Sequence, residues 1–252
     1  MAWRFSTFYP EYLYQFTTLL HDPVYRGVDV SQGQGQPVLL IPGFLAGDWT
    51  MMIMAGWLNR IGYRSYFSGI DWNVDCPNKT GEKLQWRLEQ IAKETPGPLT
   101  IIGHSLGGLL ARFLGANFPT RVRQIVALGS PLDVSNPAHV HPLVRSTFEW
   151  MRPLRRLRGP AFQRCGSVKC ACHFARTVFS TLSPSVSLIS IFSKDDEIID
   201  WRASLDPQGA RIEVSGRHIG LIVNREVYRA VAESLAGNIV VNRFSEDEHL
   251  AS

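Results

Sequence analysis

The sequence predicts an α/β protein with a mostly parallel central sheet and helices on both faces. Short, wholly apolar runs such as Val38–Ile41 and Leu99–Ile102 alternate along the chain with longer amphipathic stretches. Such runs are typical of strands that are buried on both faces, as the strands of parallel sheets are. The 252 residues, of which 45% are hydrophobic, are enough for one domain with one core.

The expected elements follow one another in strand–helix order. We expect helices at Tyr12–Leu20, Met51–Arg60, Gly81–Glu94, Leu109–Asn117 and Glu226–Leu235. We expect strands at Val38–Ile41, Arg64–Phe67, Leu99–Ile102, Val122–Leu128, Val186–Phe192 and Arg211–Val214. Stop signals support the helix ends, because Asp22-Pro23, Gly62 and Pro96-Gly97-Pro98 each follow one.

One segment, approximately residues 133–184, interrupts the alternation. It mixes large apolar side chains such as Phe148 and Trp150 with several arginines such as Arg152. We interpret it as a cap or lid inserted between two core strands of a single domain that spans residues 1–252. An ordinary solvated amphipathic helix explains the same pattern equally well.

Charge and hydropathy limit which partners and which cellular location we expect for the protein. The net charge is +4, the basic residues form no dense run, and no nucleic-acid motif accompanies them, so we expect no nucleic-acid partner. Weak attraction to an anionic membrane or substrate stays open. We see no signal-peptide pattern after Met1 and no run of roughly 18 apolar residues. The expected location is therefore cytoplasmic, with contact at a membrane or lipid surface left open.

Four cysteines are present, and three of them form a C-x4-C-x-C cluster followed by His173. They are Cys76, Cys165, Cys170 and Cys172. The even number permits two disulfides, and the cluster could bind a soft metal, although its spacing is not that of a standard zinc knuckle. We expect reduced thiols or one local disulfide in a loop.

The candidate nucleophile is Ser105, in the motif Gly103-His104-Ser105-Leu106-Gly107. The motif fits G-x-S-x-G and lies between an apolar strand and a predicted helix, which is the context that gives this short pattern its meaning. The serine must project from a tight, strained turn, and glycines on either side leave room for neighbouring backbone. The first amides of the following helix can then face a developing oxyanion.

A serine hydroxyl needs a base, and the base needs a third group that holds its tautomer. Where this motif occurs, the chain order is serine, acid, histidine. His218 follows the last predicted strand and satisfies that order, while the other histidines fit it less well. The acid lies in the turn after the preceding strand, where Asp195, Asp196, Glu197 and Asp200 are all candidates. We expect the two oxyanion donors to be the main-chain N–H of Leu106 and that of Phe44, with Leu45 as the alternative.

With these residues the chain resembles the α/β-hydrolase superfamily, and within it the lipase and esterase branch. The matching pieces are Leu40-Ile41-Pro42-Gly43-Phe44, the motif at Ser105, Leu128-Gly129-Ser130-Pro131, Ser193–Ile199 and His218-Ile219-Gly220-Leu221. In relatives the acid sits in a pattern like S-x-x-D-x-I-V, which selects Asp196 over Asp195. Glu197 stands where relatives often have glycine.

The resemblance implies a serine ester hydrolase that works through an acyl-enzyme, without a metal or cofactor. The substrate would be a small-molecule or lipid ester, because the Gly-Ser-Pro and Pro-Gly-Phe pieces and the insertion look lipase-like. The same triad could instead transfer the acyl group to an alcohol, and amidases and thioesterases share the fold. A non-catalytic binding protein on this fold is the alternative from another class.

Overall fold

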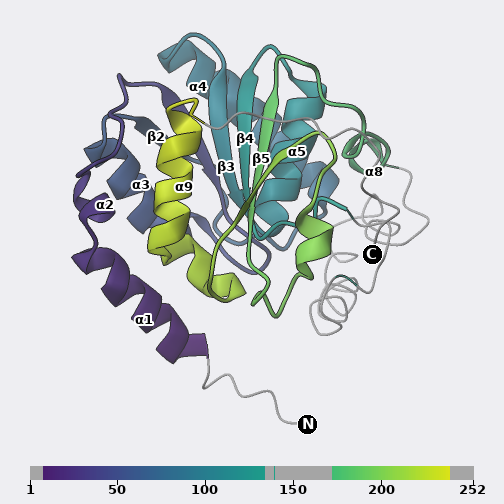
Figure 1. Cartoon of the computed structure of the whole chain (residues 1–252). Coiled ribbons are helices and arrows are strands. Elements are labelled where there is room, and N and C mark those ends of the chain that lie inside the picture. Colours follow the sequence, from purple (N-terminus) through teal and green to yellow (C-terminus); the bar gives the residue numbers. More distant parts are fainter. Residues whose placement is uncertain (1–7, 134–138, 140–171, 239–252) are drawn as a thin grey trace.

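A single parallel sheet forms the centre of the molecule. The computed structural model describes residues 8–133, 139 and 172–238, which are coloured in Figure 1. Within these ranges the sheet has six strands: β1 Pro37–Ile41, β2 Arg64–Phe67, β3 Leu99–His104, β4 Val122–Leu128, β5 Ser187–Phe192 and β6 Ala210–Glu213. All five pairings between them are parallel. The α/β fold and the parallel sheet predicted from the apolar runs are therefore confirmed.

The strand order places a topological switch point between β1 and β3. The sheet runs β2-β1-β3-β4-β5-β6, so the chain steps from β1 to one side and then returns to β3 on the other. In open parallel sheets, ligands bind at the carboxyl ends of the strands where the order reverses in this way. The loops that follow β1 at Pro42 and β3 at Ser105 therefore border the expected crevice.

Helices cover both faces of the sheet (Figure 1). One face carries α1 Phe8–His21, α2 Pro23–Arg26, α3 Met52–Arg60 and α9 Arg225–Leu235. The other carries α4 Pro77–Glu94, α5 Leu106–Asn117 and α8 His173–Thr177. Successive side chains of β1 alternate between the two cores: Val38 and Leu40 join the first, whereas Leu39 and Ile41 join the second. This alternation explains why the strand reads as one continuous apolar run.

Several helix boundaries differ from the sequence predictions. Helix α4 begins at Pro77 rather than Gly81, because a proline at the first helical position has no N–H to leave unpaired. Helix α5 begins at Leu106, directly after the nucleophile motif, rather than at Leu109. Within the described ranges, the short helical elements that were not predicted include α2, α8 and the 3₁₀ helices at Trp201–Ser204 and His218–Val223. A further 3₁₀ turn at Asp48–Met51 precedes α3.

Most of the predicted insertion, 133–184, lies outside the described residues. The part that is described, 172–184, includes α8, which packs against α4 and α5. The main-chain N–H of Phe174 donates to Oδ1 of Asn78 on α4 over 3.0 Å. The chain therefore returns from the insertion along the face of the sheet that carries the nucleophile helix.

Arg112 of α5 anchors that return. Its guanidinium donates to Oδ2 of Asp206 over 2.6 Å, to the carbonyl of Ser180 over 3.2 Å, and to the carbonyl of Val178. Both charged side chains are almost fully buried. A buried charge is tolerated only when it is paired and hydrogen-bonded, and these contacts meet that requirement.

The cysteines differ from the expectation. Cys76, just before α4, is disulfide-bonded, which corrects the expectation of reduced thiols or one local disulfide. Cys165 and Cys170 lie outside the described residues. Spacing in the sequence did not indicate this bond, because Cys76 is far along the chain from the other three cysteines.

No helix in the described ranges combines the length and the apolar character that crossing a bilayer requires.

Candidate active site

Ser105 lies in the turn between β3 and α5, at the switch point of the sheet. Its backbone has φ 54° and ψ −121°, a left-handed conformation that non-glycine residues seldom adopt. Such strain persists only where the surroundings enforce it, and it occurs at the serine of strand–turn–helix nucleophile motifs. The main-chain N–H of Ser105 donates to the carbonyl of Leu128 over 2.8 Å, which ties the turn to the end of β4.

The two glycines of the motif are required by close backbone packing. A Cβ on Gly103 would lie 2.3 Å from the carbonyl carbon of Gly107, and a Cβ on Gly107 would lie 2.2 Å from the carbonyl oxygen of Ile41. These distances are shorter than any real Cβ contact, so the turn can form only with glycine at both positions.

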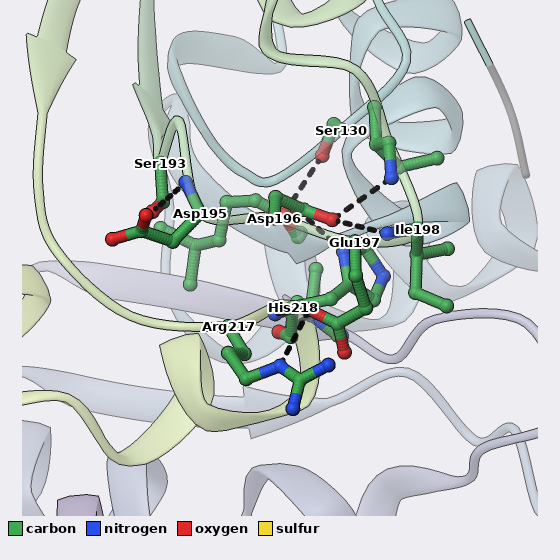
Figure 2. A network of polar contacts seen from close by, with 12 residues as sticks. Ser130, Ser193, Asp195, Asp196, Glu197, Ile198, Arg217 and His218 are labelled. Atoms are coloured by element: carbon green, nitrogen blue, oxygen red, sulfur yellow. Dashed lines mark hydrogen bonds and ion pairs between the residues drawn. The ribbon is translucent and has the colours of Figure 1, made fainter. Parts of the chain in front are cut away.

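His218 and Asp196 form a close pair at the carboxyl end of the sheet. Nδ1 of His218 lies 2.7 Å from Oδ2 of Asp196, and the two side chains are 7% and 2% exposed. The other oxygen of Asp196 accepts the main-chain N–H groups of Ile198 and Ile199, each over 2.8 Å. Because a carboxylate can only accept, Nδ1 of His218 carries the proton and Nε2 has a lone pair. Figure 2 shows this arrangement.

The neighbouring acids occupy different positions from Asp196. Asp195 is exposed, and its main-chain N–H donates to Oγ of Ser193 over 3.0 Å. Glu197 instead turns toward the histidine: Oε2 accepts the main-chain N–H of His218 and Nε of Arg217, each over 3.3 Å (Figure 2). Of the two aspartates considered from the sequence, it is Asp196 that contacts the imidazole.

His104, which precedes the serine, supports His218 from the other side. Its Nε2 lies 3.0 Å from the main-chain carbonyl oxygen of His218, and the two rings lie 4.8 Å apart. Since a carbonyl only accepts, Nε2 of His104 carries the proton. Burial, and then the nearby His218, lower the pKa of His104 from its usual 6.5 to about 3. His104 is therefore neutral near pH 7, and its position does not suit it to be the catalytic base.

The loop after β1 lies directly against the serine. A Cβ on Gly43 would lie 3.1 Å from Cβ of Ser105, so the loop and the nucleophile turn are in contact. The main-chain N–H of Leu45, the alternative oxyanion donor, donates to the carbonyl of Asn73 over 3.1 Å. Leu106 is the first residue of α5, where amides have no partner within the helix.

The structure thus brings the predicted residues from four separate segments to one edge of the sheet. Phe44 follows β1, Ser105 and Leu106 follow β3, Asp196 follows β5, and His218 begins the 3₁₀ helix after β6. Three contacts made there were not predicted from the sequence. Glu197 was considered only as a candidate acid, Gly129 only as part of a family piece, and His104 was given no role. A Cβ on Gly129 would lie 3.0 Å from Oδ2 of Asp196. Its place after the apolar run of β4, within the Leu128-Gly129-Ser130-Pro131 piece, was the signal in the sequence.

Within the described ranges, no group of three or more His, Cys, Asp and Glu side chains is arranged to hold a metal ion.

Known proteins resemble this chain in sequence and in fold. A family model described as the alpha/beta hydrolase fold matches residues 84–165, which include the motif at Ser105. A triacylglycerol lipase of Burkholderia plantarii is 27% identical over 123 residues, covering 45% of this chain and 34% of the lipase. A triacylglycerol lipase of Pseudarthrobacter phenanthrenivorans is 29% identical over 104 residues, covering 38% and 33%. The chain matches about a third of the length of each lipase.

Solved structures show the same fold over most of the chain. The Bacillus licheniformis lipase BlEst2 superposes with a TM-score of 0.58 at 13% identity, covering 82% of this chain and 94% of that one. A monoacylglycerol lipase of Paleococcus ferrophilus gives a TM-score of 0.54 at 16% identity, covering 83% and 97%.

The chain has the α/β-hydrolase fold. The fold predicted from the motifs is confirmed, and the proteins that the chain is similar to include lipases. These similarities establish the fold of the chain. The reaction of this hydrolase-fold chain depends on what its own residues can do.

Proposed function

We propose that the chain is a serine carboxylic-ester hydrolase that acts through an acyl-enzyme on acyl-chain esters. The observation that carries the proposal is the 2.7 Å contact between His218 and Asp196 on the same sheet edge as the strained Ser105. Strain at a serine together with a histidine whose tautomer is fixed by a buried carboxylate is the arrangement that nucleophilic catalysis needs.

The proposed reaction has two steps. As Oγ of Ser105 bonds to the ester carbonyl carbon, Nε2 of His218 takes the hydroxyl proton, and Asp196 stabilises the resulting imidazolium. The N–H groups of Phe44 and Leu106 hold the oxyanion until the alcohol leaves with the proton from His218. Water then adds to the acyl-enzyme with His218 again as the base, and the acid is released.

An apolar surface beside the oxyanion loop supports an acyl-chain substrate. Trp49 and Trp72 are 60% and 61% exposed, and their rings lie 6.5 Å apart. Leu45 and Met52 are also exposed in the same stretch of loop and helix start. Exposed tryptophans offer a wide apolar contact with one polar atom, which suits an ester that carries a hydrocarbon chain. The matched relatives are themselves named as lipases.

We also propose that 133–184 is a cap over this site. The described part of that segment, 172–184, returns along α4 and α5, on the side of the sheet that carries the nucleophile helix. A cap that leaves and re-enters the core there would cover the carboxyl ends of β1 and β3.

A series of p-nitrophenyl esters of increasing acyl length tests the proposal. We expect the wild type to hydrolyse them, with kcat/KM rising from acetate toward medium or long chains, and Ser105→Ala to lose the activity by more than about 10³-fold. Asp195→Asn, a matched change on the exposed neighbour, should stay within about twofold of the wild type. Activity confined to short soluble esters would contradict the acyl-chain substrate, and activity retained in Ser105→Ala would contradict the mechanism.

A further inference from the structure

The oxyanion loop is held by a residue outside the proposed triad. Asn73 lies in the loop after β2 and is 1% exposed. Its Nδ2 donates to the main-chain carbonyl of Pro42 over 2.8 Å. Pro42 is the first residue after β1, one position before Gly43, which contacts Ser105. The side chain of Asn73 thus acts at the point where the oxyanion loop leaves the sheet.

The main chain of Asn73 holds the other end of the same loop. Its N–H donates to the carbonyl of Ala46 over 2.7 Å, and its carbonyl accepts the N–H of Leu45 over 3.1 Å. Leu45 has φ 60°, so its conformation is one that leucine seldom adopts and that needs outside support. One buried residue therefore fixes both ends of the turn that contains Phe44.

A second set of hydrogen bonds holds the loop of Asn73 itself. The carboxylate of Asp48 accepts Oγ of Ser68 over 2.6 Å, the N–H of Gly69 over 2.7 Å and the N–H of Ile70 over 3.2 Å. In return, the N–H of Asp48 donates to the carbonyl of Ile70 over 2.9 Å. The loops after β1 and β2 are therefore joined twice, through Asn73 and through Asp48.

Asn73 is a costly residue at this position. Its Oδ1 is buried and has no hydrogen-bond partner among the described residues, which is unfavourable for a polar atom. The side chain is therefore not explained by simple burial. What it supplies is the donor that fixes the Pro42 carbonyl.

We propose that Asn73 is a positioning residue that orients the oxyanion loop, so that the N–H of Phe44 faces the charge that develops on the substrate. The inference rests on the proposed ester hydrolysis. A donor contributes to catalysis only when it is aimed before the reaction begins. Loss of the Asn73 side-chain bond lets the turn relax, and a displacement of about 1 Å can reduce rate by about 10²-fold.

The test replaces Asn73 by a residue of the same shape that cannot donate. Asn73→Asp should lower kcat for a p-nitrophenyl ester by about 10²-fold and change KM by no more than about twofold. Asn59→Asp is the matched control. This substitution makes the same change in charge at an exposed residue near the end of α3, outside the loops after β1 and β2. It should retain wild-type kinetics.

Inhibition by an alkyl trifluoromethyl ketone separates positioning from a general effect on structure. Oγ of Ser105 bonds to the ketone carbon, His218 takes the proton, and the oxygen becomes an oxyanion held by the loop. For Asn73→Asp, Ki should rise by the same factor by which kcat/KM falls. An unchanged Ki, or wild-type kcat, would overturn the inference.

Two further measurements keep the outcome decisive. If Asn73→Asp does not fold, as judged by circular dichroism, Asp48→Asn is measured in its place. For that variant, a fall in kcat/KM without a matching rise in Ki overturns the inference. A fluorophosphonate probe is applied to the wild type in parallel. A wild type that does not react removes the proposed function itself, whereas a reactive wild type with a fully active Asn73→Asp removes only the role of Asn73.

Discussion

The main-chain carbonyl of His218 accepts a hydrogen bond from Nε2 of His104 over 3.0 Å. The N–H of the same residue donates to Glu197, and its ring donates to Asp196. Three side chains, one from the end of β3 and two from the loop after β5, therefore fix the proposed base. This degree of support is what a catalytic histidine requires, because a small displacement removes it from reach of the serine.

His104 makes the stability of the protein depend on pH. Its pKa is about 3 in the folded protein against 6.5 in the unfolded chain. As the pH falls below 6.5, the unfolded state takes up a proton that the folded state does not. The free energy of unfolding then falls by up to about 1.4 kcal/mol per pH unit until the folded pKa is reached. His104→Gln keeps a donor and lacks this titration, so its free energy of unfolding should decline less steeply from pH 6 to pH 4.

Urea unfolding of the two proteins at pH 8, 6, 5 and 4 measures the effect. Curves that fall in parallel would show that His104 is protonated as easily in the folded state as in the unfolded state.

Glu197 supports His218 through a hydrogen bond to its main chain. Glu197→Ala removes an acceptor worth about 1.5 kcal/mol, so kcat should fall roughly tenfold. Glu197→Gln keeps an oxygen acceptor and should recover most of that loss. Glu213→Ala, which breaks an exposed ion pair with Lys194, is the control and should leave kcat unchanged. Equal losses in the Ala and Gln variants would mean that charge, rather than the hydrogen bond, is what matters.

Gly129 leaves room for the Asp196–His218 pair. An added Cβ would lie 2.8 Å from Cδ1 of Leu221 and 3.0 Å from Oδ2 of Asp196, at a backbone φ of +52°. Gly129→Ala should therefore lower both stability and kcat. Gly35→Ala, at φ +82° with nothing within 4 Å of the new Cβ, has only the conformational cost of about 1 kcal/mol. Thermal unfolding and kcat of the two variants separate crowding from backbone strain, and equal effects in both would exclude crowding.

The buried Arg112–Asp206 pair stabilises the segment that returns from the insertion. Arg112→Met leaves the carboxylate of Asp206 buried without its partner, and the free energy of unfolding should fall by about 3–5 kcal/mol. The double variant Arg112→Met/Asp206→Leu removes both charges and should recover part of the loss. Urea unfolding measures the free energy of unfolding of both variants. A double variant less stable than Arg112→Met would contradict the claim that the buried carboxylate needs its partner.

Local patterns were sufficient to predict the fold, and they supplied the candidate residues of the site. Strands β1 and β3 coincide with short apolar runs, and the motif at Ser105 lies between β3 and α5, so the sequence displays these features directly. Asp196 was selected over Asp195 by a family pattern, and it is the residue that contacts His218.

The remaining features depend on contacts between segments that are distant in the sequence. Asn73 is a single asparagine in a polar stretch, and its bond to Pro42 exists only because β1 and β2 are neighbours in the sheet. The disulfide at Cys76 was missed because this residue is distant in the sequence from the other three cysteines. His104 was set aside as a base, and its bond to His218 spans 114 positions of the chain, which no local pattern reports.

The central claim is that Ser105 is a nucleophile activated by His218. Reaction with a fluorophosphonate probe tests this directly, because the serine oxygen bonds to phosphorus as fluoride leaves. Intact mass and peptide mapping should show one adduct, on Ser105, and none on Ser105→Ala, with labelling of His218→Ala slowed by about 10³-fold or more. A folded wild type that gains no adduct, or gains it on another residue such as Ser130, would contradict the assignment of Ser105.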